Sequence, residues 1–457
     1  MRYSIALWVL LGTIVVSPLQ AESLLQIFQQ AESNDPQLKI AESDRLIAEQ
    51  NRPLAQAGLL PVVRLQGALN ENYNTADFFG NDSNENTSLG YTVSLSMPLY
   101  DPDKQLAIDQ VDVSIQQALA NFESARQNLM LRVSDAYFNV LARQDDVRFT
   151  ESTRLALARQ LEQTKQRFEV GLIAITDVQE SQAGYDAAIA EVIRTKNFLD
   201  NAYQVLREIT GRYYQNLSTL KTDVTLLNPD PNDIKKWVDT ALEQNPAIIA
   251  SQLAVEIARQ AIERARTAEL PLVGLGASHG YEHVLRGDTN PNMSDGNTRN
   301  QIGVNVSYNL YTGGATRAQI SIAQQQHAKA IDNLEQVRRN IERQVHNSYL
   351  NVLSNISQVQ ALEQAVRSQE TALEATQTGF DVGTRTSVDV LESQRRLLGA
   401  LRDYSQARYN YVLATLQLKQ AAGILNVKDL QTINTWLTDA SEAHTSPVMD
   451  NPEINAE

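Results

Sequence analysis

The chain has 457 residues, a formal net charge of −15 and no cysteine. Such an acidic chain is a poor partner for nucleic acid. Without cysteine it forms no disulfide bond and no thiolate metal site, and it carries no lipid on an N-terminal cysteine.

The first 21 residues have the pattern of a secretory signal peptide. Arg2 precedes the apolar stretch 5–16, and Ala21 is a small residue at the expected cleavage point. We expect residues 1–21 to be removed on export, with a retained anchor helix as the alternative. No other stretch approaches the ~18 consecutive apolar residues of a membrane-spanning helix, so we expect any membrane embedding to use β-strands.

The mature sequence contains an internal repeat. Residues 36–67 return as residues 246–277, with prolines and apolar positions in register. An internal repeat of this length predicts equivalent structural units. We expect two tandem structural repeats, 22–230 and 231–438.

Long stretches without glycine or proline predict long helices. Residues 103–170 and 315–378 contain neither and are rich in strong helix formers. We expect helices over 103–170 and 315–380, each roughly 100 Å long at 1.5 Å per residue. Helices of this length must pack beside others as rods or as the wall of a cylinder. Shorter partner helices are expected at 36–60, 177–210, 247–269 and 388–422.

Apolar and polar residues alternate in two segments, 88–99 and 301–310, which is typical of strands with one apolar face. The expected strands are about 62–73, 87–100, 272–283 and 300–311. Their lengths fit the ~9–11 residues of a tilted membrane strand. Tyrosines are expected near strand ends at the lipid–water boundary: Tyr73, Tyr91, Tyr100, Tyr281, Tyr308 and Tyr311. The hairpin loops 74–87 and 284–300 are expected to face the exterior.

Two soluble hairpins would show the same alternation, which keeps a second interpretation open. If the strands lie in lipid, four of them cannot close a barrel, which needs at least about eight. Several copies of the chain would therefore have to share one barrel. The mixed segments 212–245 and 424–437 are interpreted as a collar outside the helices, and the polar residues 439–457 as a disordered tail.

Two glycines mark helix–turn–helix tips in equivalent places. Gly171 and Gly383 suit helix C-termini. Thr176, and either Thr386 or Ser387, suit the N-cap of the helix that follows.

These N-caps would place an aspartate in the first turn of each following helix. Asp177 and Asp389 would then either complement the helix dipole or line a functional opening. Asp389 shares a helix face with Glu392, and repetition around an axis would turn such positions into carboxylate rings that favour cations. Arg385 has no basic counterpart in the first repeat, where Ile173 stands, and is a candidate tether to the acidic tips.

No motif indicates catalysis. The histidines are scattered, and although His279 and His283 share a strand face, no suitably spaced carboxylate joins them. We expect no enzymatic activity, no metal and no cofactor.

The tip motifs carry a resemblance to a known family. The segments Val170–Val178 and Val382–Leu391, together with the repeat and the two hairpins, resemble the TolC family of outer-membrane channel proteins. The chain is most similar to the branch that serves both protein secretion and drug efflux. The resemblance covers essentially all of the mature chain.

The resemblance implies a membrane α+β fold in the outer membrane of a Gram-negative cell. It implies a homotrimer whose twelve strands, four per chain, form a β-barrel continuous with a long α-helical periplasmic barrel. It also implies docking to a periplasmic adaptor protein and to an inner-membrane transporter of the ABC, RND or MFS class, and contact with outer-membrane lipid.

The resemblance also implies roles for the tip residues. Asp389 and Glu392 would line the periplasmic entrance, and Arg385 would tie the inner helix pair to Thr176 and Asp177 of the outer pair. Phe380 stands where the family pattern has a tyrosine, which implies one hydroxyl fewer in the closed network.

The sequence therefore favours a passive exit duct from periplasm to exterior, opened by an iris-like movement of its periplasmic tip. The alternative is a periplasmic structural protein or adhesin built from helical rods with soluble hairpins.

Overall fold

The computed structural model describes residues 21–76, 82–214, 216–221, 224–286 and 296–438. The expected signal peptide up to residue 20, the expected tail 439–457 and the centres of both hairpin loops lie outside the described residues. No helix in the described part of the chain combines the length and the apolarity needed to cross a bilayer.

The chain divides into two compact units, and each draws on both sequence repeats. The first unit consists of residues 1–39, 125–241 and 343–457, and the second of residues 40–124 and 242–342. Four helices pass from one unit into the other: α2 (Pro36–Ala57), α3 (Pro102–Glu169), α5 (Ile234–Gln244) and α7 (Ala315–Asp381).

The first unit is helical. It contains α1 (Leu24–Asn34), α4 (Ile175–Thr210), α8 (Ser387–Ala421), α9 (Val427–Thr435) and the C-terminal parts of α3 and α7. Its core holds large side chains that are almost completely buried: Leu24, Ile27, Phe28, Leu129, Tyr137, Phe138, Leu206 and Tyr411. Two short strands, β3 (Thr219–Leu220) and β6 (Leu437–Thr438), pair antiparallel and join the two segments expected to form the collar.

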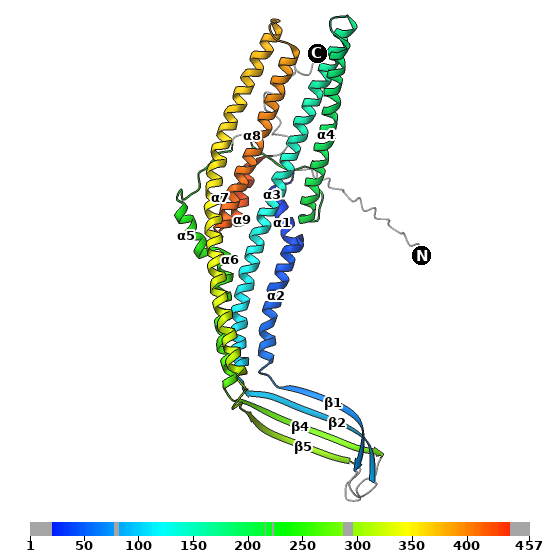
Figure 1. Cartoon of the computed structure of the whole chain (residues 1–457), viewed down its shortest axis with the longest axis vertical. Helices are drawn as coiled ribbons and strands as arrows, with labels where there is room; N and C mark the ends of the chain where they lie inside the picture. Colours follow the sequence, from blue (N-terminus) through cyan, green and yellow to red (C-terminus); the bar gives the residue numbers. More distant parts are fainter. Residues whose placement is uncertain (1–20, 77–81, 215, 222–223, 287–295, 439–457) are drawn as a thin grey trace, which may run out of the picture. The chain divides into compact units, whose positions relative to one another are not determined.

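The second unit joins helices to a sheet (Figure 1). The helical part contains α6 (Pro246–Arg266), a 3₁₀ turn (Thr267–Glu269), most of α2 and the N-terminal parts of α3 and α7. The Arg264 guanidinium makes two 3.0 Å hydrogen bonds to the Asp103 carboxylate and so fastens α6 to α3. The Arg52 guanidinium, 2.7 Å from Asp112, does the same for α2.

The sheet has four antiparallel strands in the order β1-β2-β4-β5. These are β1 (Val62–Ala76), β2 (Asp82–Tyr100), β4 (Leu272–Arg286) and β5 (Gly296–Ser307). Because the order places β1 and β5 at the two ends, each has one side without a partner strand among the described residues of this chain.

The strands differ from the expected ranges at their ends. All four strands run further into the expected loops 74–87 and 284–300, because cross-strand pairing continues to Ala76↔Asp82, Thr87↔Arg286 and His283↔Gly296. As a result Tyr91 and Tyr281, expected near strand ends, lie in the middle of β2 and β4 and face each other.

The fourth strand also ends earlier than expected. β5 stops at Ser307 instead of continuing to residue 311, because its partner β4 begins at Leu272, opposite Ser307. Pro271 precedes that pair and has no N–H group to extend the ladder. Tyr308 and Tyr311 therefore lie just outside the strand.

Candidate functional site at the helix–turn–helix tips

Both tips have the same hydrogen-bonded turn. At the end of α3 the Leu172 N–H donates to the Arg167 carbonyl (2.9 Å) and the Gly171 N–H to that of Phe168 (2.8 Å). This is the Schellman pattern, and it requires a left-handed residue. Gly171 supplies it with φ 79°, and Gly383 does so at the end of α7 with φ 81°.

The two helices that follow begin differently. Thr386 caps α8 through a capping box, in which its side chain accepts from the Asp389 N–H and the Thr386 N–H donates to Asp389 Oδ2 at 2.8 Å. The expectation that Thr176 caps α4 is wrong. The N-cap residue is Ala174, which has no side-chain acceptor, and Thr176 is already inside the helix.

Because of this difference, only one of the two aspartates has its carboxylate bound by the N-cap residue of its own helix. Asp389 receives hydrogen bonds from both the N–H and the hydroxyl of Thr386, which lower the pKa of its carboxyl, with a smaller contribution from Arg385. Asp177 occupies the equivalent position in α4, where it is exposed and has no such cap to join. The Asp177 carboxylate is thus directed to solvent or to a partner.

The negative charge of Glu392, the second residue expected at the entrance, is partly neutralised by arginines on the same helix. Glu392 lies 3.6 Å from the Arg395 guanidinium and 3.2 Å from that of Arg396, one turn further along α8. Sequence reasoning missed both arginines, although their i+3 and i+4 spacing from Glu392 was a sufficient signal.

Arg385 lies in the α7–α8 turn, and its aliphatic part crosses Gly379. A Cβ atom at Gly379 would come within 2.7 Å of Arg385 Cγ, so a larger residue there would displace the arginine. No hydrogen bond or ion pair joins Arg385 to Thr176 or Asp177 within the described part of one chain.

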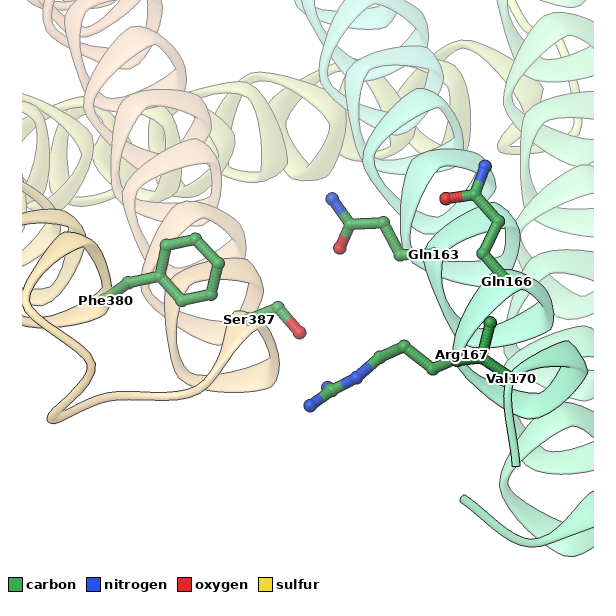
Figure 2. Close-up of a pocket in the computed structure, with 6 residues that line it drawn as sticks. All are labelled: Gln163, Gln166, Arg167, Val170, Phe380 and Ser387. Carbon is green, nitrogen blue, oxygen red and sulfur yellow. The ribbon is translucent and has the colours of Figure 1, made fainter. Parts of the chain in front are cut away.

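A cleft of about 440 Å³ separates the two helix pairs at the tip. Figure 2 shows Arg167 reaching from α3 toward the start of α8, with Phe380 on the opposite wall. The remaining lining residues are Gln163, Gln166, Val170 and Ser387. Sequence reasoning identified Phe380 as a tip residue but missed Arg167 and the two glutamines, which belong to an ordinary polar helix pattern.

The structure also bears on metal binding and on the two histidines of β4. The described residues contain no group of three or more potential ligands that could hold a metal ion. His279 and His283 do not form a pair in space, because four residues of extended strand separate them.

Comparison with known proteins gives a consistent result. A family model described as outer membrane efflux protein matches the chain twice, over residues 27–212 and 237–424. Outer membrane protein TolC of Vibrio cholerae is 37% identical over 94% of this chain and 97% of that protein, and TolC of Escherichia coli is 34% identical over 95% and 87%. The alkaline protease secretion protein AprF of Pseudomonas aeruginosa is 29% identical over 90% and 87%.

Solved structures agree on the fold. The Campylobacter jejuni CmeC outer membrane channel superposes with a TM-score of 0.75, covering 92% of this chain and 90% of that chain, at 16% sequence identity. At this identity the likeness shows the fold.

Proposed function

Because the chain belongs to the outer membrane efflux protein family, we propose that it is an outer-membrane exit duct that conducts substrates passively from the periplasm to the exterior. Its similarity to the TolC proteins supports a role in efflux, and its similarity to AprF supports a role in type I secretion. The observation that carries the proposal is a sheet with one apolar face and two unpaired edges.

The two faces of the sheet have opposite chemistry. On one face lie apolar residues that are strongly exposed in the single chain, among them Leu65 (73%) and Ile302 (79%). Their sequence neighbours on the other face are polar, for example Gln66 and Gln301. Such alternation fits strands with lipid on one side and water on the other.

The unpaired edges argue for assembly. In lipid each unsatisfied backbone group costs several kcal/mol, and a barrel needs at least about eight strands. Four strands per chain give twelve in a trimer. We propose a homotrimer whose shared barrel continues into a helical periplasmic tunnel.

The tips supply the gate in this proposal. The Arg385 guanidinium would bind Thr176 and the uncapped Asp177 carboxylate of a neighbouring chain and hold the helix pairs together. Opening would break these bonds and move the α7–α8 pair outward. Asp389 and Glu392 would line the entrance. The Thr386 hydrogen bonds keep Asp389 ionised, whereas the arginines beside Glu392 would offset part of the negative charge of the ring.

A duct of this kind needs partners that supply energy and substrates. We propose docking to a periplasmic adaptor protein and to an inner-membrane transporter of the ABC, RND or MFS class. The described residues contain no group that indicates catalysis or a cofactor of their own.

Oligomeric state and conductance test the duct. We expect the detergent-purified mature protein to run as a trimer when unheated and as a monomer when boiled, and to conduct ions across a planar bilayer. A soluble monomer that needs no detergent and does not conduct would instead support the periplasmic rod or adhesin.

The tether is tested by removing both of its charges. We expect Arg385→Ser combined with Asp177→Ala to raise single-channel conductance, because the closed tip loses its inter-chain bonds. The matched control is Arg194→Ser with Glu191→Ala, an exposed pair on α4 whose charged atoms lie 2.6 Å apart. Equal conductance of the tip variant and the wild type would contradict the tether.

A further inference from the structure

The apolar face of the sheet changes character part of the way along β4 and β5. On the helix side, the cross-strand neighbours on this face are apolar, as in the row Leu95, Ala277 and Ile302. One row further on, Val93 on β2 still faces this way, but its neighbours are His279 and Asn300.

The next two rows are polar on β4 and β5 as well. Tyr91 on β2 pairs with Tyr281, which pairs with Thr298, and Leu89 pairs with His283, which pairs with Gly296. None of the residues in these three rows is acidic, although the chain as a whole carries a net charge of −15.

The polar side chains form a connected cluster. His279 Nδ1 lies 2.6 Å from Asn300 Oδ1, and His279 Nε2 lies 3.4 Å from the Tyr91 hydroxyl. Because the amide oxygen only accepts, Nδ1 donates to it and Nε2 accepts from the tyrosine. The Tyr91 ring also lies 5.9 Å from the His279 ring and 6.1 Å from the Tyr281 ring, measured between centroids.

Tyr281 is positioned by a glycine. Its hydroxyl lies over Gly296, where a Cβ atom would come within 2.5 Å of the oxygen. Only glycine lets the phenol lie across β5 in this way. The cluster of Tyr91, His279, Tyr281 and Asn300 is therefore packed into a definite arrangement on an exposed surface.

In the proposed barrel, the height of the cluster corresponds to the edge of the membrane. Tyr100 lies opposite Val273 because of a bulge after Pro98, which puts it on the same face nine residues from Tyr91. The bulge residue adds no rise, so the two rows are eight residues apart on β4, from Val273 to Tyr281. At ~3.3 Å per residue and a strand tilt of ~40°, they lie about 20 Å apart along the membrane normal, comparable to the ~25 Å apolar band of an outer-membrane protein. The cluster then lies where hydrocarbon gives way to lipid headgroups.

We propose that the cluster of Tyr91, His279, Tyr281 and Asn300 binds the phosphate-bearing headgroup of a lipid packed against the sheet. The Tyr281 hydroxyl and the Asn300 amide N–H groups supply the hydrogen-bond donors, because the His279 N–H and the Tyr91 hydroxyl are donated within the cluster and hold it in place. The absence of carboxylates from these rows removes repulsion of an anion. This inference rests on the proposed function, because only a sheet in the outer membrane meets such a lipid.

The test measures lipid binding by native mass spectrometry of the detergent-purified protein. The probes are bisphosphorylated lipid A and the same lipid after enzymatic removal of its phosphates. We expect the wild type to bind the phosphorylated form about tenfold more tightly, since hydrogen bonds to a charged group are the strong ones. His279→Leu combined with Asn300→Leu should abolish that preference.

Two further variants keep the test specific. Tyr281→Phe removes one hydroxyl but keeps the ring over Gly296, and it should lower the preference by about threefold. Ser278→Ala with Gln301→Ala, the polar pair at the same height on the opposite face, should leave it unchanged.

Three results would overturn the proposal: equal binding of both lipids by the wild type, full preference in the His279/Asn300 variant, or displacement of the lipid by millimolar inorganic phosphate. Trimer formation and conductance are measured on the same samples. Loss of both in the wild type would refute the duct itself, whereas a conducting trimer without lipid preference would refute only this inference.

Discussion

Asp145 is a carboxylate buried between two helices of the first unit. The Tyr409 hydroxyl of α8 donates to Asp145 Oδ2 at 2.9 Å, and the Arg148 guanidinium lies 2.9 Å from Oδ1. Burial nevertheless raises the pKa of Asp145, and the charges of Arg148 and Arg408 oppose this only in part. The ionised form of Asp145 therefore destabilises the contact between α3 and α8, and the size of this effect depends on pH.

We expect Asp145→Asn to remove a pH-dependent component of stability. A folded-state pKa above the unfolded value of 3.8 means that the folded chain binds the proton more tightly. The contribution of the protonated Asp145 carboxyl to the free energy of unfolding is therefore fully present below about pH 3.8. It is lost as the pH rises through the pKa of the folded state.

The measurement is the urea midpoint of wild type and variant between pH 3.5 and 7. The wild type should lose stability relative to the variant as the pH rises. Asp239→Asn, an exposed carboxylate on α5, controls for the loss of charge alone. Parallel pH curves for wild type and Asp145→Asn would show that the buried carboxyl does not matter.

At the scale of elements, the two repeats use the same residue to fasten their long helices. Tyr137 on α3 recurs as Tyr349 on α7, shifted by the repeat. The Tyr137 hydroxyl donates to the Ser218 carbonyl at 2.5 Å, and the Tyr349 hydroxyl to Asn232 Oδ1 at 2.6 Å. Both bonds tie a long helix to a segment that was expected to form the collar.

The two bonds should differ in strength because their acceptors differ. Tyr137→Phe leaves a buried carbonyl with one donor fewer, which costs about 1–3 kcal/mol. Tyr349→Phe should cost less, about 0.5–1.5 kcal/mol, because Asn232 is exposed and can turn to water. Urea unfolding followed by the fluorescence of Trp237 and Trp436 compares the two variants, and a larger effect at Tyr349 would reverse this ranking.

At the scale of the whole molecule, the proposed duct depends on which face of the sheet meets lipid. Ile302 and Gln301 are neighbours on β5 and are both exposed in the single chain, but they point to opposite faces. In the proposed duct, only the environment supplied by assembly and membrane distinguishes them.

We expect Ile302→Arg to disrupt membrane assembly and Gln301→Arg to be tolerated. An arginine facing lipid near the bilayer centre costs about 2–4 kcal/mol, whereas one facing water costs little. The measurement is the yield of heat-modifiable oligomer in outer-membrane fractions. Similar yields for both variants would show that the apolar face does not meet lipid.

Much of the molecule could be predicted from local patterns. The helices, the alternating strands and the turn glycines depend on residues within a few positions of one another. Gly171 illustrates this, because the Schellman turn that ends α3 needs a left-handed residue, and glycine adopts that conformation most readily. The family resemblance stated from the tip motifs is confirmed by the family match.

The tertiary structure decided what depends on distant partners. β5 ends at Ser307 because β4 has no pairing residue beyond Leu272, and Tyr91 meets His279 only through the register between β2 and β4. Asp177 and Asp389 look equivalent in the repeat, yet one aspartate is held in a capping box and the other is exposed. Short-range periodicity determines the elements, but pairing, burial and the availability of a charge depend on contacts between residues far apart in the chain.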